Sequence, residues 1–236
     1  MSLEAASKIS AVVPTWNESQ EIEATLESLR AAGVAEIVVV DGGSTDDTVR
    51  RAEPLADLVL EEPDGLFRQL NLGASRTTGD VLVFHYADVG FPKNGVEVLR
   101  QTLARPEVLG GAFRLRFTSQ RFRYRFTAAA ANLRNRVGLG PFGDQSLFVR
   151  VATFRHLGGF NPGAFFEDLA LVRALRRKGE FRVVDAEVEV SVRRWESLGY
   201  LRTLASHYGL YALYFTRFGR ATRSSRDKTQ SLRAVR

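Results

Sequence analysis

The sequence predicts an α/β protein with a mostly parallel central sheet and helices on both faces, and three observations predict it. The chain has 236 residues, 44% hydrophobic and 25% charged, which is typical of one globular domain with a short appendage. Its first half alternates short apolar runs with amphipathic helical segments, the pattern of a parallel sheet. The apolar runs end in polar turn residues, where such sheets bind ligands.

Each element expected in the first half follows from a local pattern. Ile9–Val13 is an apolar run that ends at Pro14, as a buried strand would. Glu21–Ala32 carries apolar residues at helical spacing and is followed by Gly33, a common residue after a helix. The alternation continues with strand Glu36–Val40, a helix that ends near Ala52, strand Leu58–Leu60, helix Phe67–Ser75 and strand Asp80–Tyr86.

The second half is less regular. Its expected elements are strand Gly111–Phe117, a helical stretch within Phe122–Val137, strand Ser146–Val149, helix Leu169–Lys178, strand Phe181–Val192 and helix Tyr200–Phe218. We expect residues 1–195 to form the main domain, 196–220 an amphipathic aromatic helix, and 221–236 a basic, disordered tail.

Composition and charge exclude several classes of function. The chain has no cysteine, which excludes disulfides, thiolate metal sites and cysteine nucleophiles. The net charge is +6, but from Arg193 onward ten basic residues face two acids, a local net charge of +8. The rest is slightly acidic, which favours a neutral enzyme with a basic arm for an anionic surface over a uniformly basic nucleic-acid binder.

Membrane-spanning and secretory segments are not predicted. The first ten residues lack the apolar stretch of a secretory signal, and no apolar run approaches the ~18 residues that span a bilayer. We therefore expect a cytoplasmic protein, either soluble or peripheral on the inner face of the membrane.

Two basic and aromatic segments leave several interpretations open. Between Gly110 and Gly143, seven arginines and no acid alternate with aromatic residues. This pattern favours a strand with a solvated face, while binding to single-stranded nucleic acid or to an anionic acceptor are the alternatives. The aromatic C-terminal helix with its basic tail suits an anionic membrane interface, a dimer interface or a core position.

Three polar clusters follow early strands: Pro14–Glu18, Asp41–Ser44 and Ala87-Asp88. Each alone could be a turn with a helix cap, but three in register predict a binding crevice at one sheet edge. The chain has neither G-x-G-x-x-G after the first strand nor a P-loop motif, so a dinucleotide or P-loop site is not supported. A strand-end aspartate with a divalent metal could instead hold a diphosphate, helped by Arg68.

The motifs Val12–Glu18, Val38–Thr48 and Gly79–Leu82, the last leading to Ala87-Asp88, resemble in order and spacing the signatures of the inverting, family-two nucleotide-sugar glycosyltransferases. The resemblance runs from about Lys8 to about Glu196. It implies the GT-A fold, a single α/β/α nucleotide-diphospho-sugar transferase domain.

The resemblance also implies site residues. Asp41 would hydrogen-bond the base or ribose, and Asp168, in Phe166-Glu167-Asp168, would be the catalytic base. Asp88 would bind Mn²⁺ or Mg²⁺, although Tyr86 replaces the first acid of the family's D-x-D and one oxygen ligand is lost. The implied donor-binding positions are Pro14, Thr15, Trp16, Glu18, Asp41, Gly43, Arg68, Asn71, Ala87, Asp144, Gln145, Glu167, Arg194 and Trp195.

Arg68-Gln69-x-Asn71-x-Gly73 and Gly143-Asp144-Gln145 are also similar to a small prokaryotic subgroup linked to arsenosugar biosynthesis, although Leu66-Phe67 and Tyr86 depart from it.

The sequence therefore favours an inverting transfer of sugar from a nucleotide-diphosphate donor, such as a UDP-sugar, to an acceptor hydroxyl. The acceptor could be anionic or lipid-linked, no nucleic-acid partner is expected, and a homodimer stays open. The alternatives are a nucleotidyltransferase and a non-catalytic nucleotide-, nucleic-acid- or membrane-binding module on the same fold.

Overall fold

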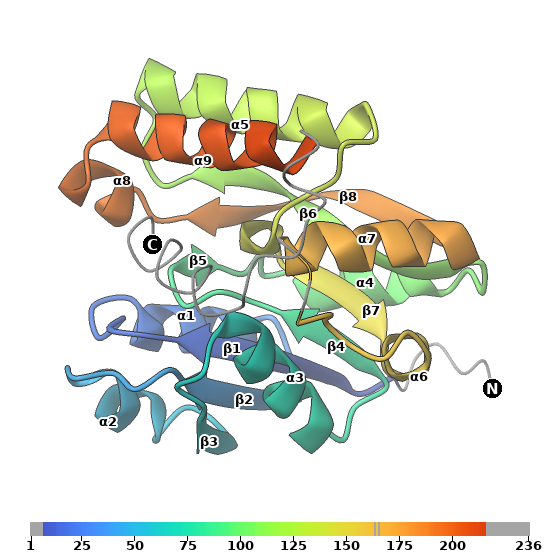
Figure 1. Cartoon of the computed structure of the whole chain (residues 1–236). Coiled ribbons are helices and arrows are strands. Elements are labelled where there is room, and N and C mark those ends of the chain that lie inside the picture. The colour runs from blue at the N-terminus through green and yellow to red at the C-terminus, as the bar shows by residue number, and fades with distance from the viewer. Residues whose placement is uncertain (1–6, 163, 165, 216–236) are drawn as a thin grey trace.

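A single eight-stranded sheet forms the centre of the computed structural model, which describes residues 7–162, 164 and 166–215 (Figure 1). The strand order is β3-β2-β1-β4-β7-β6-β8-β5, and β7 and β5 run antiparallel to the other six. The bounds of the eight strands are β1 Ile9–Thr15, β2 Glu36–Asp41, β3 Leu58–Glu61, β4 Val81–Phe84, β5 Val89–Gly90, β6 Val108–Phe117, β7 Leu147–Arg150 and β8 Glu180–Val190. The expected mostly parallel sheet is confirmed.

Helices cover both faces of this sheet and form two cores. Apolar residues of α1, α2, α4, α5 and α8 pack on one face, and those of α3, α6 and α7 on the other, which is the front in Figure 1. The bounds are α1 Ile22–Ala31, α2 Thr48–Ala52, α3 Leu66–Arg76, α4 Gly95–Leu103, α5 Phe122–Arg136, α6 Val151–His156, α7 Glu167–Lys178, α8 Arg193–Ser197 and α9 Tyr200–Phe215. A short 3₁₀ turn, η1, spans Gly143–Gln145.

Strands β1, β2 and β4 are largely apolar because both of their faces are covered. All seven residues of β1 are buried, so this strand shows no alternation of apolar and polar residues. Gly73 of α3 lies directly over β1, where a Cβ would come 2.3 Å from Val12 Cγ1. The absence of a side chain at Gly73 therefore lets α3 pack closely on the sheet.

Some elements differ from the sequence-based expectations. Strand β5 and helices α4, α6 and α8 were not expected. In the arginine-rich aromatic segment, β6 ends at Phe117 and α5 begins at Phe122, which confirms the strand and the helical stretch expected there. The expectations for residues 216–236, including Phe218 and the basic tail, lie outside the described residues. No helix in the described part of the chain has the length and apolarity needed to cross a membrane.

Candidate active site at the carboxyl edge of the sheet

The ends of β1 and β2 meet side by side, as the sequence predicted. Thr15 pairs with Asp41 in the strand register, and Thr15 Oγ1 donates a hydrogen bond to Asp41 Oδ1 at 3.0 Å. From α3, Gln69 Nε2 donates to the carbonyl oxygens of Thr15 (3.1 Å) and Val40 (2.9 Å). A Cβ at Gly42 would come within 2.9 Å of Gln69 Nε2, so a glycine leaves room for this bridge. The two strand ends are thus held at a fixed separation.

Asp41 organises the loop after β2. Its Oδ2 accepts hydrogen bonds from the backbone N–H groups of Gly43 (2.9 Å) and Ser44 (2.7 Å), while Oδ1 accepts from Thr15 Oγ1 and from Ser44 Oγ (2.5 Å). These four bonds occupy the acceptor capacity of a carboxylate. A contact between Asp41 and a base or ribose, as implied by the resemblance, therefore requires one of these internal bonds to be exchanged.

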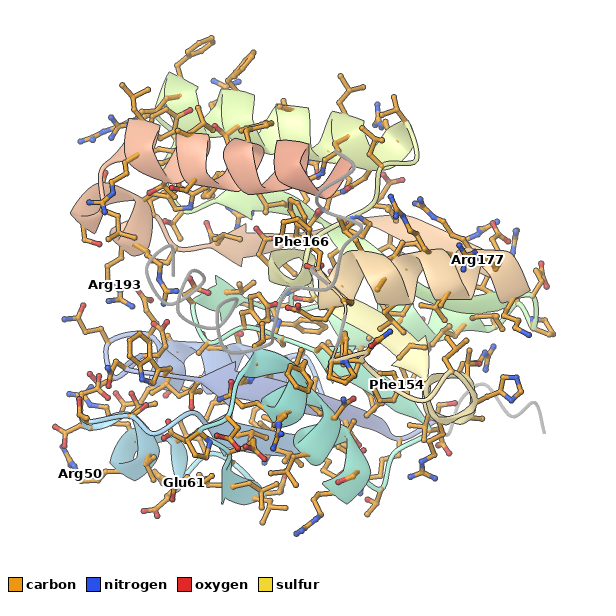
Figure 2. All side chains as sticks on the ribbon, viewed as in Figure 1. Arg50, Glu61, Phe154, Phe166, Arg177 and Arg193 are labelled. Atoms are coloured by element: carbon orange, nitrogen blue, oxygen red, sulfur yellow. The ribbon has the colours of Figure 1, made fainter. Side chains whose placement is uncertain are left out.

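Glu18 joins the loop after β1 to the distant end of β8. Its buried carboxylate forms ion pairs with Arg193 (Nη2 to Oε2, 2.6 Å) and with Arg194, and Arg193 Nε also contacts Glu21 Oε1 at 3.1 Å. Figure 2 shows Arg193 at the start of α8, beside the N-terminal half of the chain. Two cations around one buried carboxylate offset its desolvation and fix the direction of α8.

The end of β4 is built around a buried histidine. His85 Nε2 lies 2.8 Å from the Val89 carbonyl oxygen and Nδ1 lies 2.7 Å from Ser146 Oγ. A carbonyl only accepts, so Nε2 carries the proton and Nδ1 accepts from the serine hydroxyl. Burial lowers the pKa of His85 from 6.5 to about 4, against a smaller opposite effect of the Val89 hydrogen bond. The ring is therefore a neutral bridge between the β4 end and the residue after η1.

Next to His85, Tyr86 covers η1, which in turn contacts α7. A Cβ at Gly143 would come 2.2 Å from Tyr86 Oη, so the phenol lies against the glycine backbone. The N–H of Gly143 donates to Asp168 Oδ2 at 2.9 Å, and Asp168 Oδ1 accepts from the Leu169 N–H at 2.7 Å. Asp168 is buried in the first turn of α7, just after Phe166, which Figure 2 labels. The β4 end, η1 and the α7 start are thereby brought together.

Several other predicted site residues have internal partners. Asn71 exchanges two hydrogen bonds of 2.9 Å with the backbone of Phe160, and buried Gln145 bonds the Phe113 carbonyl oxygen (2.9 Å) and Asn135 Nδ2 (3.1 Å). Trp195 packs among Phe117, Tyr124 and Tyr200 in the core. The described contacts of these three side chains lie within the chain and position loops and helices, and their contacts with a donor stay predictions.

The remaining predicted positions lie along the same edge. Pro14 is the second-to-last residue of β1, half-exposed Trp16 follows the strand, and Gly43 adopts a left-handed conformation (φ 84°) after β2. Arg68 is exposed and forms an ion pair with Asp64 at 3.2 Å. Ala87 is buried, and its carbonyl oxygen accepts from Thr25 Oγ1. Asp144 lies in η1, and Glu167 begins α7.

The metal expectation can be tested against the donor set at this edge. Among the described residues, no three histidine, aspartate or glutamate side chains form a cluster that could hold a metal ion. Asp88 follows β4 as expected, and Tyr86 supplies no carboxylate. Mg²⁺ is commonly held by one or two carboxylates with substrate phosphates and water. One carboxylate at Asp88, together with substrate phosphates and water, is a donor set of this kind.

A family model described as glycosyl transferase family 2 matches residues 10–157, which contain the ends of β1, β2 and β4. The chain belongs to this family. Proteins of Mycobacterium bovis and Mycobacterium tuberculosis named PGL/p-HBAD biosynthesis glycosyltransferase are 34% identical over 93 residues, 36% of this chain and 36% of theirs. The match therefore spans about a third of the length of these curated relatives.

Solved family-like structures share the fold. A mannosyltransferase from Pyrobaculum calidifontis, in complex with GDP-Man and Mn²⁺, superposes with a TM-score of 0.67 at 21% identity, covering 98% of this chain and 70% of that one. Glucosyl-3-phosphoglycerate synthase from M. tuberculosis, in complex with Mn²⁺, UDP-Glc and phosphoglyceric acid, gives a TM-score of 0.56 at 23% identity, covering 80% and 71%. The fold of this chain is GT-A.

Three residues that were not predicted as site residues also shape the edge. Gln69 bridges two strand ends, and Asn17, at φ 54°, accepts a hydrogen bond from the Thr45 N–H at 2.8 Å. Ser146, at φ 46°, holds His85. For Gln69, the signal in the sequence was an amide side chain one turn into a helix that follows a glycine. The left-handed conformations of Asn17 and Ser146 depend on tertiary contacts and leave no local signal.

Proposed function

We propose that this glycosyltransferase moves a sugar from a nucleotide-diphosphate donor to an acceptor hydroxyl with inversion. The observation that carries the proposal is the meeting of the β4 end, η1 and the start of α7, where Asp168 receives the Gly143 N–H. This geometry supports a carboxylate fixed in position next to the strand end that carries Asp88.

Donor binding is assigned to the edge made by β1, β2 and α3. Pro14, Thr15 and Glu18 would line the nucleoside pocket, and Arg68 would contact the diphosphate from α3. Asp88 would hold a divalent cation, whose chemistry when bound is to neutralise the charge of the departing diphosphate. Arg68 needs only to exchange its exposed pairing with Asp64, which contributes little to stability.

Asp168 would act as the general base. The acceptor hydroxyl would give its proton to the Asp168 carboxylate while the hydroxyl oxygen forms a bond to the anomeric carbon of the sugar. The bond between that carbon and the diphosphate oxygen would break, and its electron pair would leave with the diphosphate. The N–H groups of Gly143 and Leu169 fix both carboxylate oxygens, so the base is preorganised. General bases typically contribute ~10² to 10⁴ in rate.

The donor base, acceptor and cellular location are finer parts of the proposal. The compared mannosyltransferase is described with GDP-Man and the compared synthase with UDP-Glc, which supports testing both donors. An anionic or lipid-linked acceptor, a cytoplasmic location peripheral to the inner membrane face, binding of the C-terminal arm to that surface, and a homodimer remain proposals that rest on the sequence.

Release of UDP from UDP-glucose and of GDP from GDP-mannose, with water as acceptor and Mn²⁺ present, tests the catalytic assignment. We expect Asp168→Asn to reduce nucleotide release at least ~10²-fold while it keeps nucleotide binding. Asp185→Asn is the matched control, because its side chain is 99% exposed on β8, and it should release nucleotide at the wild-type rate.

Two results would contradict the proposal. A rate of nucleotide release by Asp168→Asn equal to that of the wild-type chain would show that Asp168 is not the general base. Binding of a donor without release by the wild-type chain, and without transfer to any offered hydroxyl, would favour the non-catalytic module.

A further inference from the structure

Helix α5 exposes an apolar stripe on its solvent side. Its apolar members recur at helical spacing, and their exposed fractions are high: Phe122 81%, Phe126 65%, Leu133 59% and Val137, the C-cap, 63%. Ala129 continues the row between Phe126 and Leu133 and is exposed. Residues recurring every three or four positions lie on one side of a helix, so these five form one continuous surface, which we call the α5 stripe.

The other side of α5 is already occupied. Tyr124, Thr127 and Ala128 are buried against the sheet and α9, and Asn132 exchanges two 2.9 Å hydrogen bonds with the backbone of Leu115 in β6. The helix is thus fixed by its inner side. The α5 stripe is therefore not needed to hold the helix in place.

Positive charge borders the α5 stripe. Helix α5 contains four arginines and no acid, and Arg125 and Arg136 are exposed beside the stripe with no ion pair among the described residues. Neighbouring Arg121 and Arg123 share Glu196 at 3.3 and 3.7 Å. An apolar row with basic residues at its flank matches the arrangement of helices that lie in the interface of an anionic bilayer.

Helix α9 begins next to α5 and has the same character. Tyr200 Oη lies 2.8 Å from Thr127 Oγ1, and the two helices run beside each other in Figure 1. Leu201 and Tyr208 are exposed on α9, which has no acidic residue. Beyond it, residues 216–236 contain seven basic residues and one acid. All three segments therefore carry charge of the same sign.

We propose that the α5 stripe, with Arg125 and Arg136, is a docking surface for an anionic lipid bilayer. Charge argues against the other occupants. A second copy, or the basic tail itself, would bring cations against cations, and aliphatic Leu133 and Val137 offer no stacking surface to a nucleic acid. An anionic bilayer complements both the apolar row and the arginines.

This surface has a consequence for the active site, which rests on the proposed function. Asn135, at the end of α5, donates to Gln145 Oε1 in η1 at 3.1 Å, and η1 contacts Asp168 through Gly143. A bilayer bound to the outer side of α5 would therefore lie on the helix whose inner side contacts η1, next to the proposed base Asp168. This placement favours an acceptor whose hydroxyl-bearing head sits at a membrane surface.

Sedimentation of the full chain with vesicles tests the docking surface without donor or acceptor, so its outcome is independent of catalysis. We expect binding to phosphatidylcholine vesicles that contain about 30% phosphatidylglycerol, weakened by salt, and little binding to pure phosphatidylcholine. Arg125→Gln with Arg136→Gln should weaken the partition coefficient about 25-fold, at ~5-fold per arginine. Phe122→Ser with Phe126→Ser should abolish it, and Phe126→Trp should preserve it.

Arg155→Gln with Arg177→Gln is the matched control. Both arginines are exposed on α6 and α7, away from α5, as Figure 2 shows for Arg177. The control should bind like wild type, and the thermal unfolding of every variant should stay close to wild type because the changed side chains are exposed.

Three results would overturn the proposal: no binding to the anionic vesicles, equal loss in the control and the stripe variants, or unchanged binding in the stripe variants. Light scattering that shows a dimer lost with Phe122→Ser and Phe126→Ser, without vesicle binding, would assign the stripe to a second copy. Binding of a single-stranded RNA oligonucleotide in place of vesicles would assign it to nucleic acid.

Discussion

Several polar side chains at the carboxyl edge form hydrogen bonds with backbone groups of the chain itself. Asp41 binds the loop after β2, Gln69 bridges β1 to β2, and Asn71 fixes Phe160. Such contacts keep loops in one conformation before a substrate arrives, which lowers the entropic cost of binding. The binding function of this edge therefore depends on residues that need not touch the substrate.

Stability should fall as pH drops through the range set by His85. The pKa of His85 is about 4 in the folded chain and near 6.5 when unfolded, so the unfolded state binds more protons between these values. The stabilisation is complete above pH 6.5 and is lost as pH falls toward 4, by up to about 3 kcal/mol.

Urea unfolding at about pH 7.5 and about pH 4.5 measures this loss. His85→Gln should be less stable than wild type at the higher pH but should lose less on acidification. Exposed His156→Gln is the control and should follow the wild-type profile. An equal acid-induced loss in His85→Gln and wild type would show that another group is responsible.

At the scale of elements, the packing of α3 on β1 depends on Gly73. Gly73→Ala would place a Cβ 2.3 Å from buried Val12 Cγ1, so we expect it to lower the free energy of unfolding by about 1–3 kcal/mol. Gly209→Ala in exposed α9 meets nothing within 4 Å and should be neutral or stabilising, by up to about 1 kcal/mol. Chemical denaturation of both variants measures these changes. A free energy of unfolding of Gly73→Ala equal to that of wild type would show that α3 can shift to make room for the Cβ without loss of stability.

Strands β1, β2 and β4 could be predicted because burial on both faces makes them largely apolar, and turn residues mark their ends. Helix α4 was missed even though Val96, Leu99 and Leu103 have helical spacing and Asn94, a common N-cap residue, precedes them. For α5, the helical stretch expected within Phe122–Val137 is confirmed, and Tyr124 and Ala128 form its buried side. The alternation of arginine and aromatic residues, which favoured a strand for the segment as a whole, describes only the part in β6.

At the scale of the whole molecule, the active edge is assembled from both ends of the chain. Glu18 follows β1, while Arg193 and Arg194 follow β8, and their ion pairs close the edge. The motifs predicted which residues gather here, but not that Glu18 and Arg194 bind each other, because partners 176 residues apart leave no local pattern. The burial of Trp195 was hidden for the same reason.

Removing the Glu18 carboxylate should measure the strength of this closure. Glu18→Gln removes the carboxylate that pairs with Arg193 and Arg194. We expect the free energy of unfolding to fall by about 2 kcal/mol. This is less than the ~3–5 kcal/mol of fully buried ion pairs, because both arginines are partly exposed. Asp64→Asn removes the carboxylate from the exposed Arg68 pair and should cost less than about 0.5 kcal/mol. Equal losses in the two variants would contradict a special role for Glu18.

The central claim is that this edge binds a nucleotide diphosphate together with a divalent cation. Thermal unfolding with UDP, GDP, TDP, CDP or ADP, with and without Mn²⁺, tests it most directly on wild type and Asp88→Asn. At about 100 times Kd, one diphosphate should add ~2.7 kcal/mol of stability and raise Tm by roughly 5–10 °C, with Mn²⁺ enhancing the shift only in wild type. No shift with any diphosphate would contradict the account.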